Sequence, residues 1–365
     1  MGLSGLFGGT YSGRRVLVTG HTGFKGSWLA LWLHTLGARV AGLALDPEHL
    51  PAHCEQLQIP LAMDARIDLR DARAVQATLD TFQPEVVFHL AAQALVRRSY
   101  REPSATFAAN VTGLVNLLEA VRGCRSVRAI INATTDKVYE SHATPGGYRE
   151  SDPLGGHDPY SASKACAEIV SASYRLSFFS RPEAGGRRVG LATARAGNVV
   201  GGGDWAEDRL VPDLVRAASN GSRLVLRNPR ATRPWQHVLE PLSGYLLLGQ
   251  KLLAGEPVDQ AWNFGPSANA TLEVAEVVRR LQEQWPGFEV AHDGGPHPHE
   301  AVALTLDCRK AETQLGWRPI WDASTTLTRT VAWYRALHRA GELRSAIDLA
   351  AYVDDARRAG LAWAA

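Results

Sequence analysis

The sequence predicts an α/β fold, with a doubly wound parallel sheet and a smaller, interleaved second domain. Short apolar runs rich in β-branched residues, typical of buried parallel strands, alternate with stretches of helical periodicity. A glycine-rich turn follows the first run, and polar residues follow several others. Because the carboxyl ends of parallel strands share one edge of the sheet, we expect a ligand crevice at that edge.

The first strand is expected at 16–19 and the first helix at 28–36. Between them lies the run Gly20-His21-Thr22-Gly23-Phe24-Lys25-Gly26. Its glycine spacing differs from G-x-G-x-x-G but serves the same needs, a tight turn and a close approach of backbone to a pyrophosphate at a helix N-terminus. An ordinary glycine-rich turn is the alternative. We interpret the unit as the start of a dinucleotide-binding (Rossmann) domain.

An acidic residue follows the second expected strand, at the position where dinucleotide-binding domains place a carboxylate. The second strand, expected at 40–45, ends in Asp46, twenty residues after Gly26. A carboxylate there accepts hydrogen bonds from the adenosine ribose and repels a 2′-phosphate. The pattern therefore favours NAD over NADP.

Further alternation extends the sheet. We expect helices at 73–82, 110–121 and 160–178, and strands at 86–89, 129–135 and 189–195. After Asn198 the chain is richer in glycine, proline and tryptophan. The expected division is a dinucleotide-binding domain at 1–198 to which 235–262 returns, a substrate-binding domain made of 199–234 and 263–340, and a helical tail at 341–365.

Composition narrows the possible functions. The 365 residues include 39 basic and 37 acidic side chains, a net charge of +2 without a basic run, so we expect no nucleic-acid partner. The sequence contains no stretch of about 18 apolar residues, so no membrane-spanning helix is expected. The first residues lack the features of a signal peptide, and the four cysteines are scattered. We expect a soluble, cytoplasmic protein with no membrane partner.

Two short runs carry the chemistry. In Tyr160-Ser161-Ala162-Ser163-Lys164, the spacing of four puts the tyrosine and the lysine on one helix face. An ammonium beside a phenol favours the phenolate, so Lys164 is expected to lower the pKa of Tyr160 and make it a base. The pattern Y-x-x-x-K is common and is weak evidence by itself. The second run, Thr134-Thr135-Asp136-Lys137, falls at the end of the strand expected at 129–135 and supports a catalytic role for the tyrosine and the lysine.

Together with further motifs, these runs resemble the extended short-chain dehydrogenases/reductases that act on nucleotide sugars, and among them the CDP-glucose 4,6-dehydratases. The resemblance extends from about Val16 to Tyr334. It includes Thr19–Gly26, Ala194–Trp205, Asp208–Pro212, Arg233–Val238, Trp262–Gly265, His299–Ala301 and Leu315–Trp317.

The resemblance implies that the chain is a lyase with bound NAD that dehydrates CDP-glucose. In that reaction C4 is oxidised, the 6-hydroxyl is eliminated and the hydride returns to C6, which gives a 4-keto-6-deoxy sugar. Tyr160 corresponds to the base at O4, and Lys164 to a ligand of the nicotinamide ribose. Thr135 would hydrogen-bond O4. Asp136 would protonate the departing hydroxyl, which requires a desolvated carboxyl with a raised pKa.

Lys137 departs from the dehydratases that act on dTDP-glucose, which have a glutamate at this position as the base for C5. An ammonium cannot accept a proton. Lys137 is therefore either neutral when it acts, or a stabiliser of an enolate while another group takes the proton. A structural ion pair with Asp136 or Glu140 is the plain alternative.

The resemblance also assigns binding residues. Cofactor contacts are expected from Asp68, with loop capping as its alternative, and from Leu69 and Ala91. Arg209, Arg233 and Asn198 would face the substrate diphosphate, although surface arginines are common, and Gln93 and His299 would line the substrate site. His292, His297 and His299 lack the spacing of metal ligands, so no metal is expected.

Two other functions stay open, a nucleotide-sugar 4-epimerase and a non-catalytic protein that binds NAD and a nucleotide sugar. The Asp136-Lys137 pair argues against the epimerase, which expels no hydroxyl. We also expect a homodimer formed by the helices at 110–121 and 160–178. The residues expected at that interface are Leu114, Leu117, Leu118, Val121, Ile169, Val170, Ser173 and Leu176.

Overall fold

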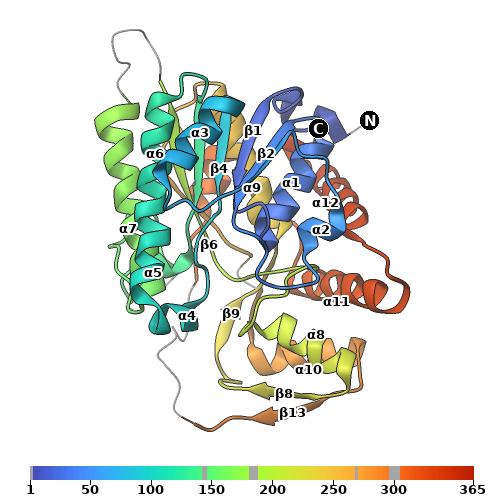
Figure 1. Cartoon of the computed structure of the whole chain (residues 1–365). Coiled ribbons are helices and arrows are strands. Elements are labelled where there is room, and N and C mark those ends of the chain that lie inside the picture. Colours follow the sequence, from blue (N-terminus) through green and yellow to red (C-terminus); the bar gives the residue numbers. More distant parts are fainter. Residues whose placement is uncertain (1–2, 142–145, 181–187, 268–269, 296–304) are drawn as a thin grey trace.

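A seven-stranded parallel sheet forms the centre of the protein (Figure 1). The structure is a computed structural model that describes residues 3–141, 146–180, 188–267, 270–295 and 305–365. The strand order is β11-β6-β5-β4-β1-β2-β3, and every neighbouring pair is parallel. The predicted doubly wound α/β fold is confirmed. The strands are β1 (Arg15–Thr19), β2 (Arg39–Ala44), β3 (Met63–Arg66), β4 (Val86–His89), β5 (Ala129–Ala133), β6 (Gly190–Ala196) and β11 (Ala261–Phe264).

Helices cover both faces of the sheet (Figure 1). One face packs against α1 (Phe24–Thr35) and α9 (Leu239–Leu253), and the other against α3 (Ala72–Phe82), α6 (Gly113–Gly123) and α7 (Pro159–Tyr174). Alternate strand residues serve the two cores: in β1, Val16 and Val18 belong to the first and Leu17 to the second. Burial on both faces explains why the strands are almost wholly apolar.

The elements predicted for the main sheet and its helices agree with the structure within a few residues. The sequence analysis identified no strand at the position of β3. Its sequence, Met-Asp-Ala-Arg, has no β-branched residue, and it lies at the edge of the sheet, where only β2 pairs with it. Side chains at an edge remain half-exposed, so the apolar signal of a buried strand is missing.

A smaller lobe lies below the carboxyl ends of the strands (Figure 1). It contains α8 (Leu210–Asn220), α10 (Val274–Gln284), the parallel pair β8 (Arg223–Leu226) with β13 (Glu289–His292), and the antiparallel pair β9 (Thr232–Pro234) with β12 (Thr271–Glu273). Strand β11 returns to the main sheet and ends two residues past the domain boundary predicted at 262.

The remaining elements are mostly short, apart from the two C-terminal helices α11 and α12. They are η1 (Leu3–Gly9), α2 (His53–Leu57), α4 (Val96–Arg101), α5 (Pro103–Phe107), η2 (Ala108–Thr112), η3 (Asp136–Val138), η4 (Arg175–Phe179), β7 (Val199–Val200), β10 (Gln236–His237), η6 (Ala311–Leu315), α11 (Ala323–Ala340), α12 (Ser345–Arg358) and η7 (Ala362–Ala364). Within the described ranges, no helix has both the length and the apolar character needed to cross a membrane.

One half of the interface expected between two copies is absent. Leu114, Leu117, Leu118 and Val121 are fully buried against the chain's own sheet, so the prediction that they form a dimer interface was wrong. Helix α6 has a single apolar face, and the whole of that face packs against the sheet. By contrast, Ile169 on α7 and Leu176 on η4, which continues α7, have exposed fractions of 58% and 69%.

The C-terminal tail is part of the core. The Tyr352 hydroxyl in α12 donates a hydrogen bond to the buried carboxylate of Glu240 in α9, at 2.7 Å. Trp363 stacks on Phe7 near the N-terminus, with ring centroids 5.0 Å apart. The tail thus closes the helical layer over α1, a role that its charged helical pattern did not indicate.

Replacing Trp363 by alanine is therefore expected to lower the free energy of unfolding by about 3–5 kcal/mol, the usual cost of removing a buried tryptophan. Urea unfolding measures it. Ile347→Ala is the control from the same tail, because Ile347 is exposed, and it should change little. Equal small effects of both changes would mean that the tail is not part of the folded core.

Candidate active site

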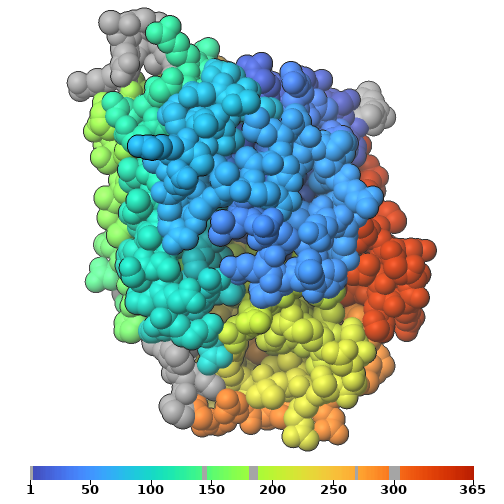
Figure 2. Space-filling model, in the orientation of Figure 1, coloured from blue at the N-terminus to red at the C-terminus, as the bar shows by residue number. Residues whose placement is uncertain are grey.

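A cavity of about 950 Å³ lies between the carboxyl ends of the strands and the smaller lobe. Figure 2 shows the surface hollowed between the blue and teal N-terminal half and the yellow segment that follows residue 200. The cavity is lined by residues from the loops after β1, β2, β4, β5 and β6, and from α8 and β8. All predicted site residues except Asp136 and those outside the described ranges line it.

The glycine turn sits at the base of the cavity. Gly20 has φ +75°, and a Cβ there would lie 2.7 Å from the Ala91 nitrogen. A Cβ on Gly26 would lie 2.0 Å from the Gly20 carbonyl oxygen. Only glycine fits these close approaches. No described side chain caps α1, so the first backbone N–H groups of this helix, from Phe24 to Gly26, face the cavity as an anion site.

The remaining predicted cofactor contacts line the same end of the cavity. Asp46 follows β2, and its exposed carboxylate lies 3.4 Å from the Arg66 guanidinium. Asp68 is held by two hydrogen bonds from Arg70, with Leu69 beside it. The Thr22 hydroxyl donates to the Leu45 carbonyl at 3.0 Å, which ties the glycine turn to the end of β2.

The reactive groups come together where β5 ends. The one-turn helix η3 carries Asp136 and Lys137, and Thr135 caps it. The Lys137 ammonium lies 2.9 Å from Asp136 Oδ1, and the carboxylate is almost fully buried. The Thr135 hydroxyl also donates to Asp136, at 3.1 Å. This is the ion pair that we considered as the plain alternative for Lys137, but it lies in the reactive site, where Tyr160 meets Thr135.

Helix α7 presents Tyr160 and Lys164 on one face, as predicted. Asp158 caps its first turn by accepting a hydrogen bond from the Ser161 nitrogen at 2.9 Å. The Lys164 ammonium donates to the Ala133 carbonyl at 3.0 Å, and burial lowers the pKa of this lysine to about 8, although Glu168 opposes the shift. Lys164 is thereby fixed beside the end of β5.

The protonation of Tyr160 differs from expectation. Burial raises its pKa above the ordinary value, and the opposing effects come first from the charge of Lys137 and then from the Thr135 hydrogen bond. The prediction that Lys164 lowers this pKa is not what the structure shows. Sequence spacing placed Lys164 on the correct face, but its ammonium is directed at the backbone of β5.

Lys25, which was predicted to bind the cofactor, also lies close to the reactive groups. Burial and the nearby charges of Lys164 and Arg209 lower its pKa to about 7, and Asp136 partly opposes them. Its ammonium lies 3.4 Å from the Tyr245 hydroxyl of α9. Several cations so close together repel one another unless anions join them, so this part of the cavity suits phosphate groups.

Of the predicted substrate residues, Arg209 and Arg233 belong to the smaller lobe, whereas Asn198 and Gln93 follow strands of the main sheet. Arg209 precedes α8 and forms an ion pair with Asp204 at 2.9 Å, and the Asn198 side-chain oxygen lies 3.4 Å from the Lys137 ammonium. Arg233 lies on β9 and lines the cavity. Gln93 also lines it, but its amide bonds to Leu95 and Thr106 and so shapes the loop before α4.

Of the three histidines considered as metal ligands, His292 is the one within the described residues. His299, like His297, falls outside the described residues, and His292 lies on β13. Among the described side chains, no group of three or more histidine, cysteine, aspartate or glutamate residues is placed to hold a metal ion.

Sequence reasoning gave no role to several charged residues of the cavity wall, among them Arg97, Asp204, Asp208 and Arg227. A signal for Arg97 was available, since Arg97 and Arg98 follow the end of β4 as other site residues follow their strands. Asp204 and Asp208 lie within motifs of the resemblance, Ala194–Trp205 and Asp208–Pro212, but no role was assigned to them. Arg227 has no comparable signal, because the smaller lobe has no regular alternation of strands and helices.

Comparison with known proteins agrees with this geometry. The family model described as GDP-mannose 4,6 dehydratase matches residues 17–330. The chain belongs to this family of nucleotide-sugar 4,6-dehydratases. A CDP-glucose 4,6-dehydratase from Salmonella typhimurium is 47% identical over 337 residues, which cover 91% of this chain and 94% of that protein. A dTDP-glucose 4,6-dehydratase from Streptomyces griseus is 29% identical, with 87% and 93% covered.

Solved structures give the same dehydratase fold. A dTDP-glucose 4,6-dehydratase from Streptomyces venezuelae, solved with NAD bound, superimposes with a TM-score of 0.74 at 26% identity, covering 88% of this chain and 97% of that one. A Thermus thermophilus UDP-glucose 4-epimerase in complex with NAD gives a TM-score of 0.75 at 28% identity, with 88% and 99% covered. The fold is therefore shared by dehydratases and epimerases.

The carboxylate after β2 yields a prediction on cofactor choice. We expect NAD to bind about tenfold or more tightly than NADP, because a 2′-phosphate would meet the charge of Asp46. Asp46→Ala should improve NADP binding, because the repelling carboxylate is gone, although Arg66 stays paired with Asp64 at 2.7 Å. Fluorescence titration measures both affinities. Asp80→Ala, on α3, is the control, and an Asp46→Ala protein that binds NADP no better would show that Asp46 does not face the ribose.

Proposed function

We propose that this chain is an NAD-dependent lyase that converts CDP-glucose to CDP-4-keto-6-deoxyglucose. The observation that carries the proposal is the meeting of Tyr160 and Thr135 with the buried Asp136–Lys137 pair at one end of the cavity. The 47% identity to a CDP-glucose 4,6-dehydratase supports the choice of cytidine nucleotide. The four free cysteines suit the reducing cytoplasm that we propose as its compartment.

The residues present fit NAD. Gly20 and Gly26 leave room that a Cβ would fill, the N-terminus of α1 points into the cavity, and Asp46 follows β2. When bound, NAD supplies the chemistry that side chains lack, by accepting a hydride from C4 of the sugar and later returning it to C6. Asp46 and the glycine turn would hold the adenosine and the pyrophosphate, and Lys164 the ribose nearer the sugar.

Tyr160 is the base for the oxidation. As the phenolate, its oxygen would take the proton of the 4-hydroxyl and become the neutral hydroxyl, while Thr135 hydrogen-bonds the same sugar oxygen. Because burial alone keeps Tyr160 protonated, the charge of Lys137 is needed to make the phenolate accessible. A cation next to the reacting tyrosine is therefore part of the oxidation as well as of the elimination.

The ion pair provides both groups for the elimination. If one proton moves along the 2.9 Å contact from Lys137 to Asp136, the pair becomes a neutral amine and a carboxylic acid. Lys137 then accepts the proton from C5, Asp136 donates to the 6-hydroxyl, the C6–O bond breaks and water leaves. Lys137 returns its proton to C5, and the proton that Tyr160 took from O4 replaces the one that Asp136 gave up.

The Asp136–Lys137 pair also argues against the epimerase alternative. An epimerase oxidises C4 and reduces it again, and it expels no hydroxyl, so it has no use for a buried acid beside the sugar. An alkali-induced absorbance of the 4-keto product distinguishes the reactions. Incubation with CDP-, dTDP-, UDP- and GDP-glucose should give it best with CDP-glucose, and its absence with all four would overturn the proposed function.

Two variants should separate the half-reactions. Tyr160→Phe is expected to abolish the NADH absorbance on mixing with substrate, because the O4 proton has no acceptor. Asp136→Asn should still form NADH but stall before water leaves. Stopped-flow absorbance in a single turnover reports the difference. Indistinguishable traces for the two variants would contradict the division of roles.

Lys137→Arg tests the proton exchange in the pair. A guanidinium keeps the positive charge but does not deprotonate in proteins, so this variant should also reduce NAD and then stall. A protein with Lys137→Arg that completes the dehydration at the normal rate would show that Lys137 acts only through its charge.

We further propose a homodimer that buries the exposed face of α7. Ile169 on α7, together with Leu176 and Phe178 on η4, which continues it, forms an apolar patch of the kind that interfaces cover. Light scattering should give twice the mass of the chain, and Leu176→Glu should give the monomer. Ile347→Glu, which changes an exposed residue of α12, is the matched control. A monomeric wild type at micromolar concentration would refute the interface.

A further inference from the structure

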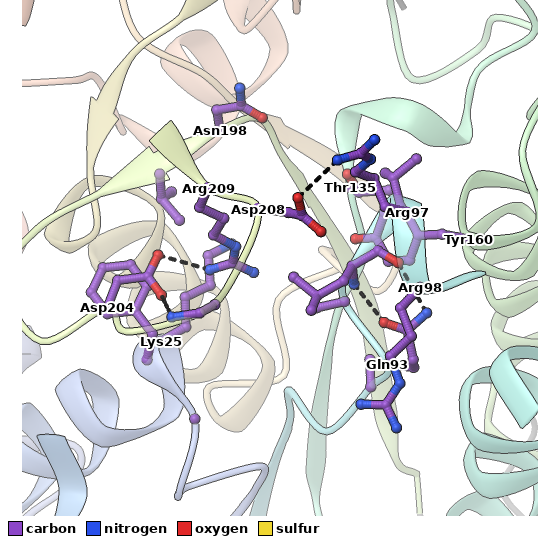
Figure 3. Close-up of a pocket in the computed structure, with 18 of the residues that line it drawn as sticks. Lys25, Gln93, Arg97, Arg98, Thr135, Tyr160, Asn198, Asp204, Asp208 and Arg209 are labelled. Carbon is purple, nitrogen blue, oxygen red and sulfur yellow. Dashed lines mark hydrogen bonds and ion pairs between the residues drawn. The ribbon is translucent and has the colours of Figure 1, made fainter. Parts of the chain in front are cut away.

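Three charged side chains bridge the two walls of the cavity. The Arg97 guanidinium lies 3.0 Å from Asp208 Oδ1, and the Arg227 guanidinium lies 2.7 Å from the same oxygen. Arg97 belongs to α4, beside the main sheet, whereas Asp208 and Arg227 belong to the smaller lobe. Figure 3 shows Arg97 pointing across the cavity to Asp208, with Arg209 and Asp204 on the far side.

The position of Asp208 is maintained at a cost. Its backbone has φ +60°, a region that non-glycine residues avoid and that aspartate and asparagine tolerate best. Arg227 also donates to the Asp208 carbonyl, at 3.1 Å, which helps hold this conformation. Burial opposes ionisation of the carboxyl, but the bonds from Arg97 and Arg227 outweigh it and lower its pKa.

Two guanidiniums that converge on one oxygen make an anion site. Each guanidinium is planar and offers several N–H donors, a geometry that suits phosphate as well as carboxylate. All three side chains are about 30% exposed, so the pairs are only partly shielded from water and exchange readily. A diphosphate offers more oxygens and more charge than a single carboxylate.

We propose that Asp208 is an internal counter-ion, which the diphosphate of the nucleotide sugar displaces from Arg97 and Arg227. The two arginines are then substrate-positioning residues in addition to Arg209 and Arg233, and one of them reaches the substrate from the cofactor side of the cavity. The inference rests on the proposed function only for the class of substrate, a nucleoside diphosphate sugar.

The displacement of Asp208 is tested by whether each variant binds CDP more tightly or more weakly than the wild type. In calorimetric titrations with CDP, Arg97→Gln and Arg227→Gln should each bind about tenfold more weakly, whereas Asp208→Asn should bind about threefold more tightly, because the ligand has no competitor. Asparagine keeps the backbone conformation. A purely structural ion-pair cluster predicts that all three changes weaken binding.

Matched controls come from α10, where Arg279 and Glu283 form an exposed ion pair. Arg279→Gln and Glu283→Gln make the same charge changes away from the cavity and should leave CDP affinity unchanged. Cytidine, which has no phosphate, should bind all the variants as it binds the wild type. Unchanged or weaker CDP binding by Asp208→Asn would overturn the inference.

The nucleotide base is tested separately. The wild type is first titrated with CDP, UDP, GDP and dTDP, and the variants with whichever binds most tightly. A preference for another base would overturn the proposed substrate. The comparison of affinities would still test the displacement of Asp208, because Asp208→Asn should bind that nucleotide more tightly and the two arginine variants more weakly. A wild type that binds none of the four would overturn both.

Discussion

The geometry of the reactive site depends on one buried ion pair behind it. Glu168, on α7, accepts hydrogen bonds from Thr134 at 2.5 Å, Thr193 at 2.7 Å and the Arg195 guanidinium at 2.9 Å. These contacts fix α7 to the ends of β5 and β6. Tyr160 and Lys164 lie two turns and one turn before Glu168 on the same face, so their distance from Thr135 follows from it. Loss of one partner of such a pair costs about 3–5 kcal/mol and would also misplace the base.

The charges of the cavity form the second constraint. Lys25, Lys137, Lys164 and Arg209 are close enough to act on one another or on their neighbours electrostatically, and burial makes such interactions strong. Asp136 pairs with Lys137, Asp204 pairs with Arg209, and Asp208 pairs with two further cations, Arg97 and Arg227. A site that receives two diphosphates needs this excess of positive charge, and internal carboxylates keep it tolerable before ligands bind.

The same fold supports more than one reaction, and the difference is local. The chain superimposes on an epimerase about as well as on a dehydratase, with TM-scores of 0.75 and 0.74. In the function that we propose, the sheet, the glycine turn and the Tyr160–Lys164 face serve the oxidation that both reactions need. The acid and the base that distinguish a dehydratase would then come from two adjacent residues of η3, Asp136 and Lys137.

The sequence by itself determined the sheet, the glycine turn and the members of the reactive site, because buried strands, close backbone approaches and helical spacing each demand particular residue types in a fixed order. It did not identify the edge strand β3, it expected the apolar face of the helix at 110–121 to be exposed, and it took Lys164 rather than Lys137 as the cation that acts on Tyr160. In each case the burial or the contact depends on segments that are distant in the chain. The sequence left open whether Lys137 pairs with Asp136 or Glu140, and the structure decided for Asp136. Only the tertiary structure showed that Arg97 meets Asp208, 111 residues away, because a contact between the main sheet and the smaller lobe leaves no local periodicity.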